Sequence, residues 1–370
     1  MNPKEKNLKA NGETTAMEKR FTIPYIQAAR GIAVVLVMLF HASQMANKYF
    51  QINFLGVSDM GRSGGYAYFF VLTGFLMYTL YQRHFGHAEM WLSFIVKRFL
   101  RIYPLYWLVT LAVIPVYFLM PSFGLGFETK PAEIVRSLLL VPGANPPILG
   151  VAWSLIYIVF FYIAFSLLFV LRKPAAFLLF TVWVAIIGLN SLGWIHLKDN
   201  LWIRFLFDGF HLEFMLGIAV AFFLQHVAIR KSRMWLAAGI AVFPIVWGFR
   251  HVYPDLSYVN TLYTLGSALV LVGIGSLKVK APEWLKPLQF LGDASYSILL
   301  TSLVCLSITL KVAKAAHMTE WISPAAVTSL CFLAALVMCC VFYAFIEKPL
   351  VQRLKQLLLP KIQPTAAASK

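Results

Sequence analysis

The sequence predicts an all-α integral membrane protein, a polytopic helical bundle of about ten transmembrane helices with both termini in the cytoplasm. Of its 370 residues, 60% are hydrophobic and only 13% are charged, whereas about a quarter of a soluble domain is charged. The mean hydropathy is +0.74. Apolar windows of roughly 17–25 residues, the length that crosses a bilayer as a helix, recur along the whole chain.

These windows cover residues 26–45, 65–82, 104–121, 148–171, 174–190, 205–226, 234–249, 258–277, 292–312 and 322–346. Their orientation follows from the basic residues. With the N-terminus in the cytoplasm, more than two thirds of the 32 Lys and Arg residues fall on the cytoplasmic side, as the positive-inside rule requires. The net charge of +17 therefore reflects membrane topology, and we expect membrane lipids rather than nucleic acid as its partner.

The chain divides into three parts. Residues 1–20 are polar and charged, and we expect them to be a disordered cytoplasmic tail. Residues 21–350 form one membrane domain, and residues 351–370 begin as a basic amphipathic stretch that suits the surface of the inner leaflet. The four cysteines fall in apolar windows without a metal-ligand spacing, so we expect no metal site.

Arg30 and His41 lie in the first apolar window, where a central Arg costs roughly 2.5–3.5 kcal/mol on insertion scales. Their separation is close to three helical turns, so both lie on one stripe of the helix, roughly 16 Å apart along its axis. A neutral imidazole can take a proton from a hydroxyl, which contributes ~10²–10⁴-fold in rate. We therefore interpret His41 and Arg30 as candidate catalytic residues, against the alternative of a buried His satisfied by a neighbouring carbonyl or hydroxyl.

Arg98 and Arg101 are three residues apart and share a helix face. Tyr103 follows them, and Pro104 is expected to break or begin a helix there. Two guanidinium forks beside the membrane can hold phosphates in bidentate fashion, so this segment is a candidate site for a donor such as acetyl-CoA. The alternative is that these arginines only anchor the third span on the cytoplasmic side.

Two groups near the outer face are candidates for binding an acceptor. Trp153 and Tyr157 could stack on a sugar, although such aromatic residues more often form an interfacial belt. Asp208, His211 and Glu213 cluster at the outer start of the sixth span and could bind a hydroxyl group, although a structural polar cluster fits equally well.

Together these segments resemble the membrane-bound acyltransferase family 3, most of all its exopolysaccharide O-acetyltransferase branch. The resemblance extends from about Tyr25 to Leu350, and the order of its motifs is more specific than any one of them. The motifs are Gln27–Ala33 followed by His41, Phe69–Leu76, Arg98–Trp107, Gly150–Leu155, Glu213–Gly217, Leu291–Ser297 and Ile346–Leu350.

The resemblance implies a multi-pass enzyme of the bacterial inner membrane. It would move an acyl group, usually acetyl, from cytoplasmic acyl-CoA to a hydroxyl of an extracytoplasmic polysaccharide or lipid-linked oligosaccharide. It implies that Arg30 and His41 are essential, and that Arg98 and Arg101 form a paired-arginine motif placed to meet the acyl donor, beside Tyr103 as a further candidate for binding the donor. A transporter or flippase of a lipid-linked saccharide is the alternative function, but it has no evident need for the arginine pair.

Two positions depart from the family pattern. Ile158 stands where the family usually has a Glu, and Ser302 stands where it often has a His. Either change leaves three possibilities open: a different acceptor, a dispensable residue, or weakened catalysis.

Overall fold

The computed structural model describes residues 3–57, 64–197, 200–253 and 258–358, and within these ranges every regular element is a helix. The α-helices are α1 Pro3–Phe50, α2 Gly65–Tyr81, α3 Glu89–Leu119, α4 Pro131–Leu138, α5 Trp153–Val170, α6 Lys173–Ser191, α7 Leu201–Leu206, α8 Phe210–His226, α9 Ser232–Val252, α10 Val259–Gly275, α11 Lys286–Asp293, α12 Ser295–Ala315, α13 Pro324–Phe342 and α14 Lys348–Leu358. A π-helical turn, Tyr343–Glu347, joins α13 to α14.

The described residues contain eight helical segments that are long and apolar enough to cross a membrane. Two further apolar helices, α2 and α10, have 17 residues each, which corresponds to roughly 26 Å of helix and lies at the short end of the range that spans a bilayer. The predicted polytopic helical class is therefore confirmed.

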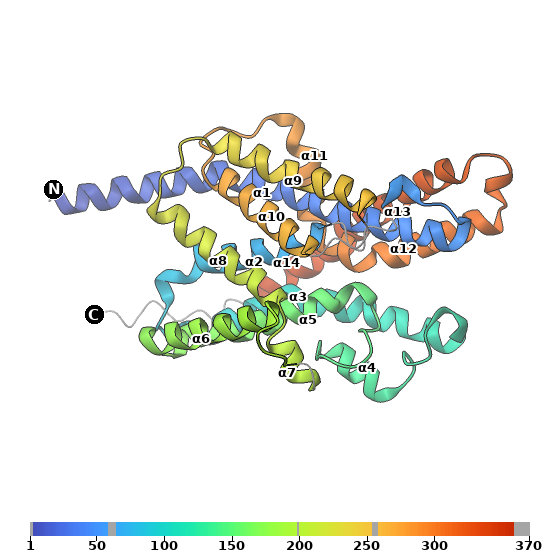
Figure 1. Ribbon diagram of the computed structural model, residues 1–370, viewed down its shortest axis with the longest axis horizontal. Helices are drawn as coiled ribbons and strands as arrows, with labels where there is room; N and C mark the ends of the chain where they lie inside the picture. Colours follow the sequence, from blue (N-terminus) through green and yellow to red (C-terminus); the bar gives the residue numbers. More distant parts are fainter. Residues whose placement is uncertain (1–2, 58–63, 198–199, 254–257, 359–370) are drawn as a thin grey trace.

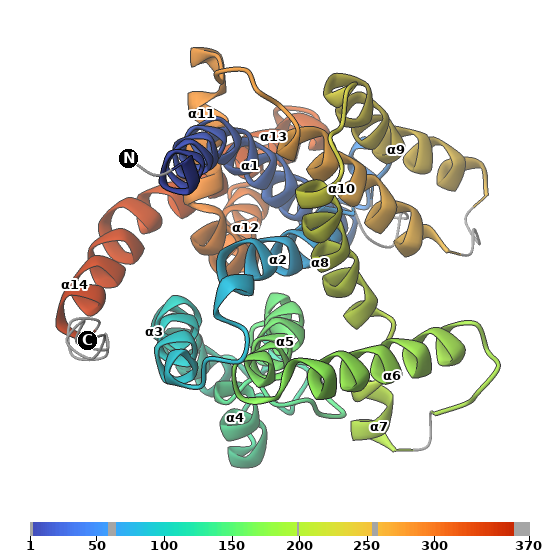
Figure 2. The same ribbon diagram turned by 90° about the vertical axis from the view of Figure 1, so that its left-hand side faces the viewer.

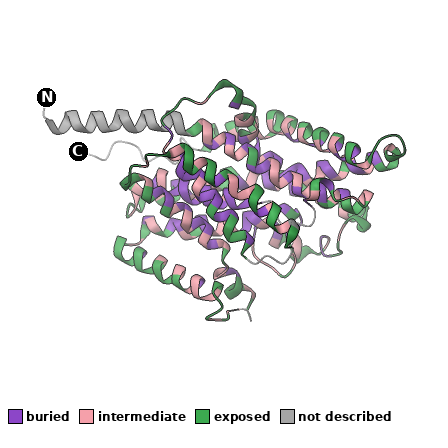
Figure 3. Cartoon of the chain, turned by 45° about the horizontal axis from the view of Figure 1, so that its top comes forward, coloured by how far each residue is buried: buried purple, intermediate pink, exposed green. Residues whose placement is uncertain are grey.

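The helices fall into two groups that face each other. Figure 2 shows α3 to α7 on one side and α1, α2 and α9 to α13 on the other, with α8 beside α2. Most long helices run roughly along the longest axis of the molecule (Figure 1). Buried residues concentrate between the helices (Figure 3), whereas α6 and α9 are mostly exposed, with 11% of their apolar windows buried. Their apolar outer surfaces suit contact with lipid.

Glycines allow two pairs of helices to approach closely. A Cβ atom on Gly31 would lie 2.2 Å from the carbonyl oxygen of Leu288, and one on Gly292 would lie 1.9 Å from that of Gln27, so α1 and α11 touch backbone to backbone. Gly74 and Gly217 do the same where α2 crosses α8. Small residues at crossings are the usual device of membrane helix packing. Here the crossing of α1 and α11 fixes the position of Arg30 along the helix axis relative to α11 and α12.

One boundary of the predicted spans is wrong. The third helix does not begin at Pro104 but at Glu89, and Pro104 lies inside it. Proline is tolerated within membrane helices because neighbouring groups satisfy the freed carbonyl. Arg98 and Arg101 therefore project from the middle of a long helix rather than from its end.

The two predicted tails are described only in part. Helix α1 begins at Pro3, and the disorder expected for residues 1–20 stays a prediction. The amphipathic stretch from residue 351 continues α14 as far as Leu358, and the remainder of the predicted C-terminal tail lies outside the described residues.

Candidate active site

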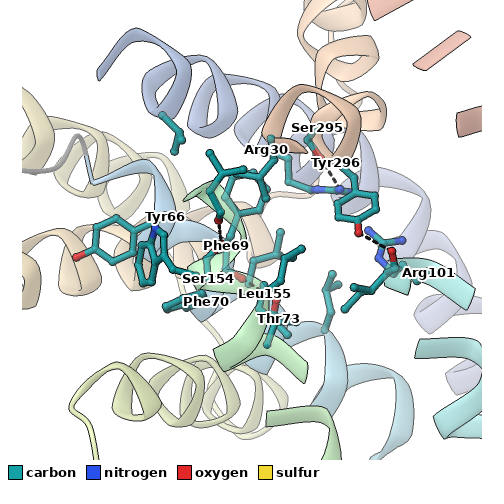
Figure 4. A pocket seen from close by; sticks show the side chains of 18 of the residues that line it. Arg30, Tyr66, Phe69, Phe70, Thr73, Arg101, Ser154, Leu155, Ser295 and Tyr296 are labelled. Atoms are coloured by element: carbon teal, nitrogen blue, oxygen red, sulfur yellow. Dashed lines mark hydrogen bonds between the residues drawn. The ribbon is translucent and has the colours of Figure 1, made fainter. Parts of the chain in front are cut away.

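A cavity of about 440 Å³ lies between the two helix groups. Helices α1, α2 and α12 line it from one side, and α3 and α5 line it from the other. Figure 4 shows Arg30, Ser295 and Tyr296 on one wall and Arg101 nearby. The cavity thus joins residues that are far apart in the sequence, such as Arg30 and Tyr296, which are separated by 266 positions.

One stripe of α1 forms a wall of this cavity along its length. Arg30, Val37, Phe40, His41 and Gln44 all line it. The two ionisable residues of the first apolar window therefore face the same space, about three helical turns apart. Gln44 lies one turn beyond His41, within hydrogen-bonding reach of its imidazole.

Arg30 is held by Ser295 on α12 and by Gln27 on its own helix, α1. Its Nη2 donates to Ser295 Oγ at 2.6 Å, and its Nη1 donates to Gln27 Oε1 at 2.7 Å. The Nε2 of Gln27 in turn donates to Asp293 Oδ1 at 2.7 Å. The guanidinium is therefore fixed on one edge by neutral oxygen atoms and keeps its positive charge facing the cavity.

Arg98 lies in a cage of aromatic rings. Its guanidinium carbon is 5.4 Å from the ring centre of Tyr81 and 5.5 Å from those of Phe94 and Tyr162. Its Nη2 donates to the hydroxyl of Tyr81 at 2.8 Å. Cation–π contacts of this kind stabilise a partly desolvated cation, and here they restrict the direction in which the arginine points.

Arg101 lines the same cavity and is exposed. The carboxylate of Glu347, in the π-helical turn, lies close enough to Arg101 and Arg30 to interact electrostatically. Glu347 Oε2 is itself held by the backbone N–H and the hydroxyl of Ser297, at 3.1 and 2.5 Å. π-Helical turns often occur at functional sites, and this one brings a carboxylate up to the arginines.

The cavity carries an excess of positive charge. Arg30, Arg98 and Arg101 all line it, and none of them forms an ion pair with a carboxylate in the part of the chain that the structure describes. An anionic group with several oxygen atoms, such as a phosphate, would complement this arrangement. Across the same described residues, no group of His, Cys, Asp and Glu side chains could hold a metal ion.

Trp153 is the one predicted acceptor residue that lines the main cavity. Trp153, Tyr157 and Asp208 also line a second, smaller pocket of about 190 Å³. His211 is fully buried, and its Nε2 bonds to the carbonyl oxygen of Phe205 at 2.9 Å. Glu213 is buried in the first turn of α8. The predicted outer cluster is therefore divided, with Asp208 facing a pocket and the other two packed inside.

Tyr103 lies outside both pockets. Its hydroxyl donates to the carbonyl oxygen of Leu139 at 3.1 Å, and its ring stacks on Phe99. In the structure it links α3 to the end of α4.

The two departures from the family pattern lie in different surroundings. Ile158 lines the main cavity, so an apolar group stands at a wall where the family usually presents a carboxylate. Ser302 is buried and is absent from the lining of either pocket.

Several contributors to the site were not predicted from the sequence. Ser295, Tyr296 and Tyr81 hold or face the arginines, and Glu347 supplies a nearby carboxylate. Ser295, Tyr296 and Glu347 belong to motifs that the resemblance includes, but no spacing rule links them to Arg30. Tyr81 carries no sequence signal.

Comparison with known proteins agrees with this geometry. The model of a family described as "Acyltransferase domain" matches residues 23–344. The chain is 29% identical over 328 residues to "Exopolysaccharide production protein ExoZ" of Rhizobium meliloti (strain 1021), covering 85% of this chain and 95% of that protein. No solved structure matches. The chain therefore belongs to the membrane-bound acyltransferase family 3 and is a multi-pass acyltransferase.

Proposed function

We propose that this acyltransferase moves an acetyl group from cytoplasmic acetyl-CoA to a hydroxyl of an extracytoplasmic polysaccharide or lipid-linked oligosaccharide, in a bacterial inner membrane. One observation carries the proposal: a single cavity holds three arginines and His41. The name of the Rhizobium relative, an exopolysaccharide production protein, supports a polysaccharide acceptor. The family membership favours this reading over a transporter of lipid-linked saccharides.

The arginines suit the donor. Coenzyme A carries several phosphates, and planar guanidinium groups bind phosphate oxygens in bidentate fashion. Arg98 and Arg101 would hold these phosphates from the cytoplasmic side. Arg30, fixed by Ser295 and Gln27, would support the pantetheine arm as it extends along the stripe of α1 towards His41.

His41 suits the transfer step. Its imidazole would take the proton of the acceptor hydroxyl while that oxygen attacks the thioester carbon. The C–S bond then breaks, and the leaving thiolate takes the proton back from the imidazolium. The products are the acetylated acceptor and free coenzyme A, so atoms and charge balance.

The test replaces His41 by Ala. Acetyl transfer should fall by about 10²-fold or more, while acetyl-CoA binding stays unchanged because the phosphates contact the arginines. His87→Ala is the matched control, since His87 is exposed and lies outside the cavity. Normal transfer by a well-expressed His41→Ala protein would contradict the catalytic role.

A further inference from the structure

The smaller pocket is formed by three separate parts of the chain. Residues 142–147 form one wall, Trp153 and Tyr157 of α5 form a second, and Arg204 and Asp208 around α7 form a third. It therefore combines two aromatic rings with a guanidinium and a carboxylate. The carboxylate oxygen Oδ1 of Asp208 accepts a hydrogen bond from the backbone N–H of Phe210 at 2.9 Å, which orients the carboxylate.

The loop wall is held in shape by one arginine. Arg136 Nη1 donates to the carbonyl oxygen of Val141 at 3.2 Å, and its Nη2 donates to those of Asn145 and Pro146 at 2.9 and 3.1 Å. Its Nε donates to Glu133 Oε2 at 2.7 Å. The pocket therefore has a preformed wall, which lowers the ordering cost of binding a ligand.

Trp153 lies between this pocket and the main cavity, because it lines both. The ring is packed edge-on against Tyr66 and Phe70, with centroids 5.7 and 6.0 Å away. A ligand lying against Trp153 in the smaller pocket is therefore separated from the main cavity, which His41 lines, by this one residue. From the distribution of Lys and Arg residues, we expect the end of the molecule where α3 ends and α5 begins to face away from the cytoplasm.

We propose that the smaller pocket binds one pyranose unit of the acceptor saccharide and presents its hydroxyl to the main cavity, an inference that rests on the proposed function. The apolar C–H face of a pyranose packs on aromatic rings such as those of Trp153 and Tyr157. Its hydroxyls can accept from Arg204 and donate to Asp208. A volume of about 190 Å³ is below the roughly 300–1,000 Å³ of pockets for drug-sized ligands, which favours a single sugar unit over an oligosaccharide.

The test uses the full chain in its own cells, with the native copy replaced by Arg204→Ala or Asp208→Asn. Arg204 is exposed, and Asn keeps an oxygen for the N–H of Phe210, so both variants should fold. Acyl esters on the secreted polysaccharide are measured after alkaline release. Each variant is also purified, and its acetyl-CoA dissociation constant is measured by calorimetry. Lys130→Ala is the control, because Lys130 is an exposed cation beside α4 that lines neither pocket.

Each variant should lower the acyl content by about tenfold, as expected for the loss of one charge-assisted hydrogen bond, with the acetyl-CoA dissociation constant unchanged. Acyl content within twofold of the unaltered protein in both variants would overturn the pyranose site. A fall in acyl content together with weakened acetyl-CoA binding would also overturn it, because the damage would then be general. Failure of the unaltered protein to bind acetyl-CoA would contradict the proposed function instead.

Discussion

Arg30 and Ser295 are 265 positions apart, yet the guanidinium of the first donates to the hydroxyl of the second at 2.6 Å. This bond ties the stripe of α1 that bears His41 to the first turn of α12. Tyr296, the next residue of α12, donates to the carbonyl oxygen of Ile102 on α3 at 2.6 Å. Two adjacent residues of α12 therefore bridge Arg30 to the helix that carries Arg98 and Arg101.

Ser295→Ala should reduce acetyl transfer without unfolding the protein. It removes one hydrogen bond to a charged group, worth about 1.5–3 kcal/mol, and leaves Arg30 held only by Gln27. Steady-state transfer to the native acceptor checks this, with Ser329→Ala as the control because Ser329 is a half-buried serine of α13 outside the cavity. Unchanged transfer by Ser295→Ala would show that Gln27 alone orients the guanidinium.

Tyr81→Phe should weaken acetyl-CoA binding by about fivefold, which corresponds to about 1 kcal/mol. The ring that faces Arg98 remains, but the hydroxyl that accepts from Arg98 Nη2 at 2.8 Å is lost. Calorimetric titration measures the effect. Tyr78→Phe is the matched control on the same helix, since the Tyr78 ring contacts Phe85 and Phe222 instead of the cavity, and it should bind like the unaltered protein.

Gly292→Ala should destabilise the protein by about 1–3 kcal/mol, the usual cost of overpacking. Its Cβ would lie 1.9 Å from the carbonyl oxygen of Gln27, so α11 must move away from α1. Thermal unfolding in detergent measures the loss. Gly188→Ala on α6 is the control, because a Cβ there meets nothing within 4 Å, and its unfolding temperature should not fall.

The loop beside the smaller pocket should respond to acid. The hydrogen bond from Arg136 lowers the pKa of Glu133 from its usual 4.5. A carboxyl with a lowered folded-state pKa stabilises the fold above the unfolded pKa, and this contribution is lost as the pH falls through the lowered value. The amide protection factors of Val141, Gly143, Ala144 and Asn145, which correct for the intrinsic pH dependence of exchange, should therefore be constant around neutral pH and should fall well below pH 4.5.

Arg136→Gln isolates the cause of that response. Without the guanidinium, the protection factors of the loop should be low at neutral pH as well, and most of their dependence on acid should disappear. Glu283→Gln serves as the control, because Glu283 pairs with exposed Lys286 and lines neither pocket. If the loop of the Arg136→Gln protein still exchanged slowly at neutral pH, Arg136 would not be what holds the wall.

Much of the fold could be predicted from the sequence because the bilayer imposes a length and an apolar composition on each span. The shared helix face of Arg30 and His41 could also be predicted, since helical periodicity alone places them on one stripe. The start of α3 was not, because the charged segment around Arg98 hides a continuous helix from Glu89. In the structure, the aromatic cage of Tyr81, Phe94 and Tyr162 shields that charge.

The hydrogen-bond partners of the site residues were harder to predict from the sequence. Gln27, Asp293 and Ser295 meet because α1 and α11 touch at Gly31 and Gly292, and such a tertiary contact leaves no periodic signal. The separation of Asp208 from His211 and Glu213 could not be predicted from the sequence either. Asp208 and His211 have a helical spacing, but Asp208 precedes α8 whereas His211 lies within it, so they face different surroundings.

The proposed function requires the arginines of the main cavity to bind an acyl-CoA donor. Isothermal titration of acetyl-CoA into the detergent-purified protein, and into an Arg98→Ala/Arg101→Ala variant, measures this binding. The unaltered protein should bind acetyl-CoA, and the variant should lose this binding while remaining folded. No binding of acetyl-CoA or of other acyl-CoAs by a folded, unaltered sample would contradict it.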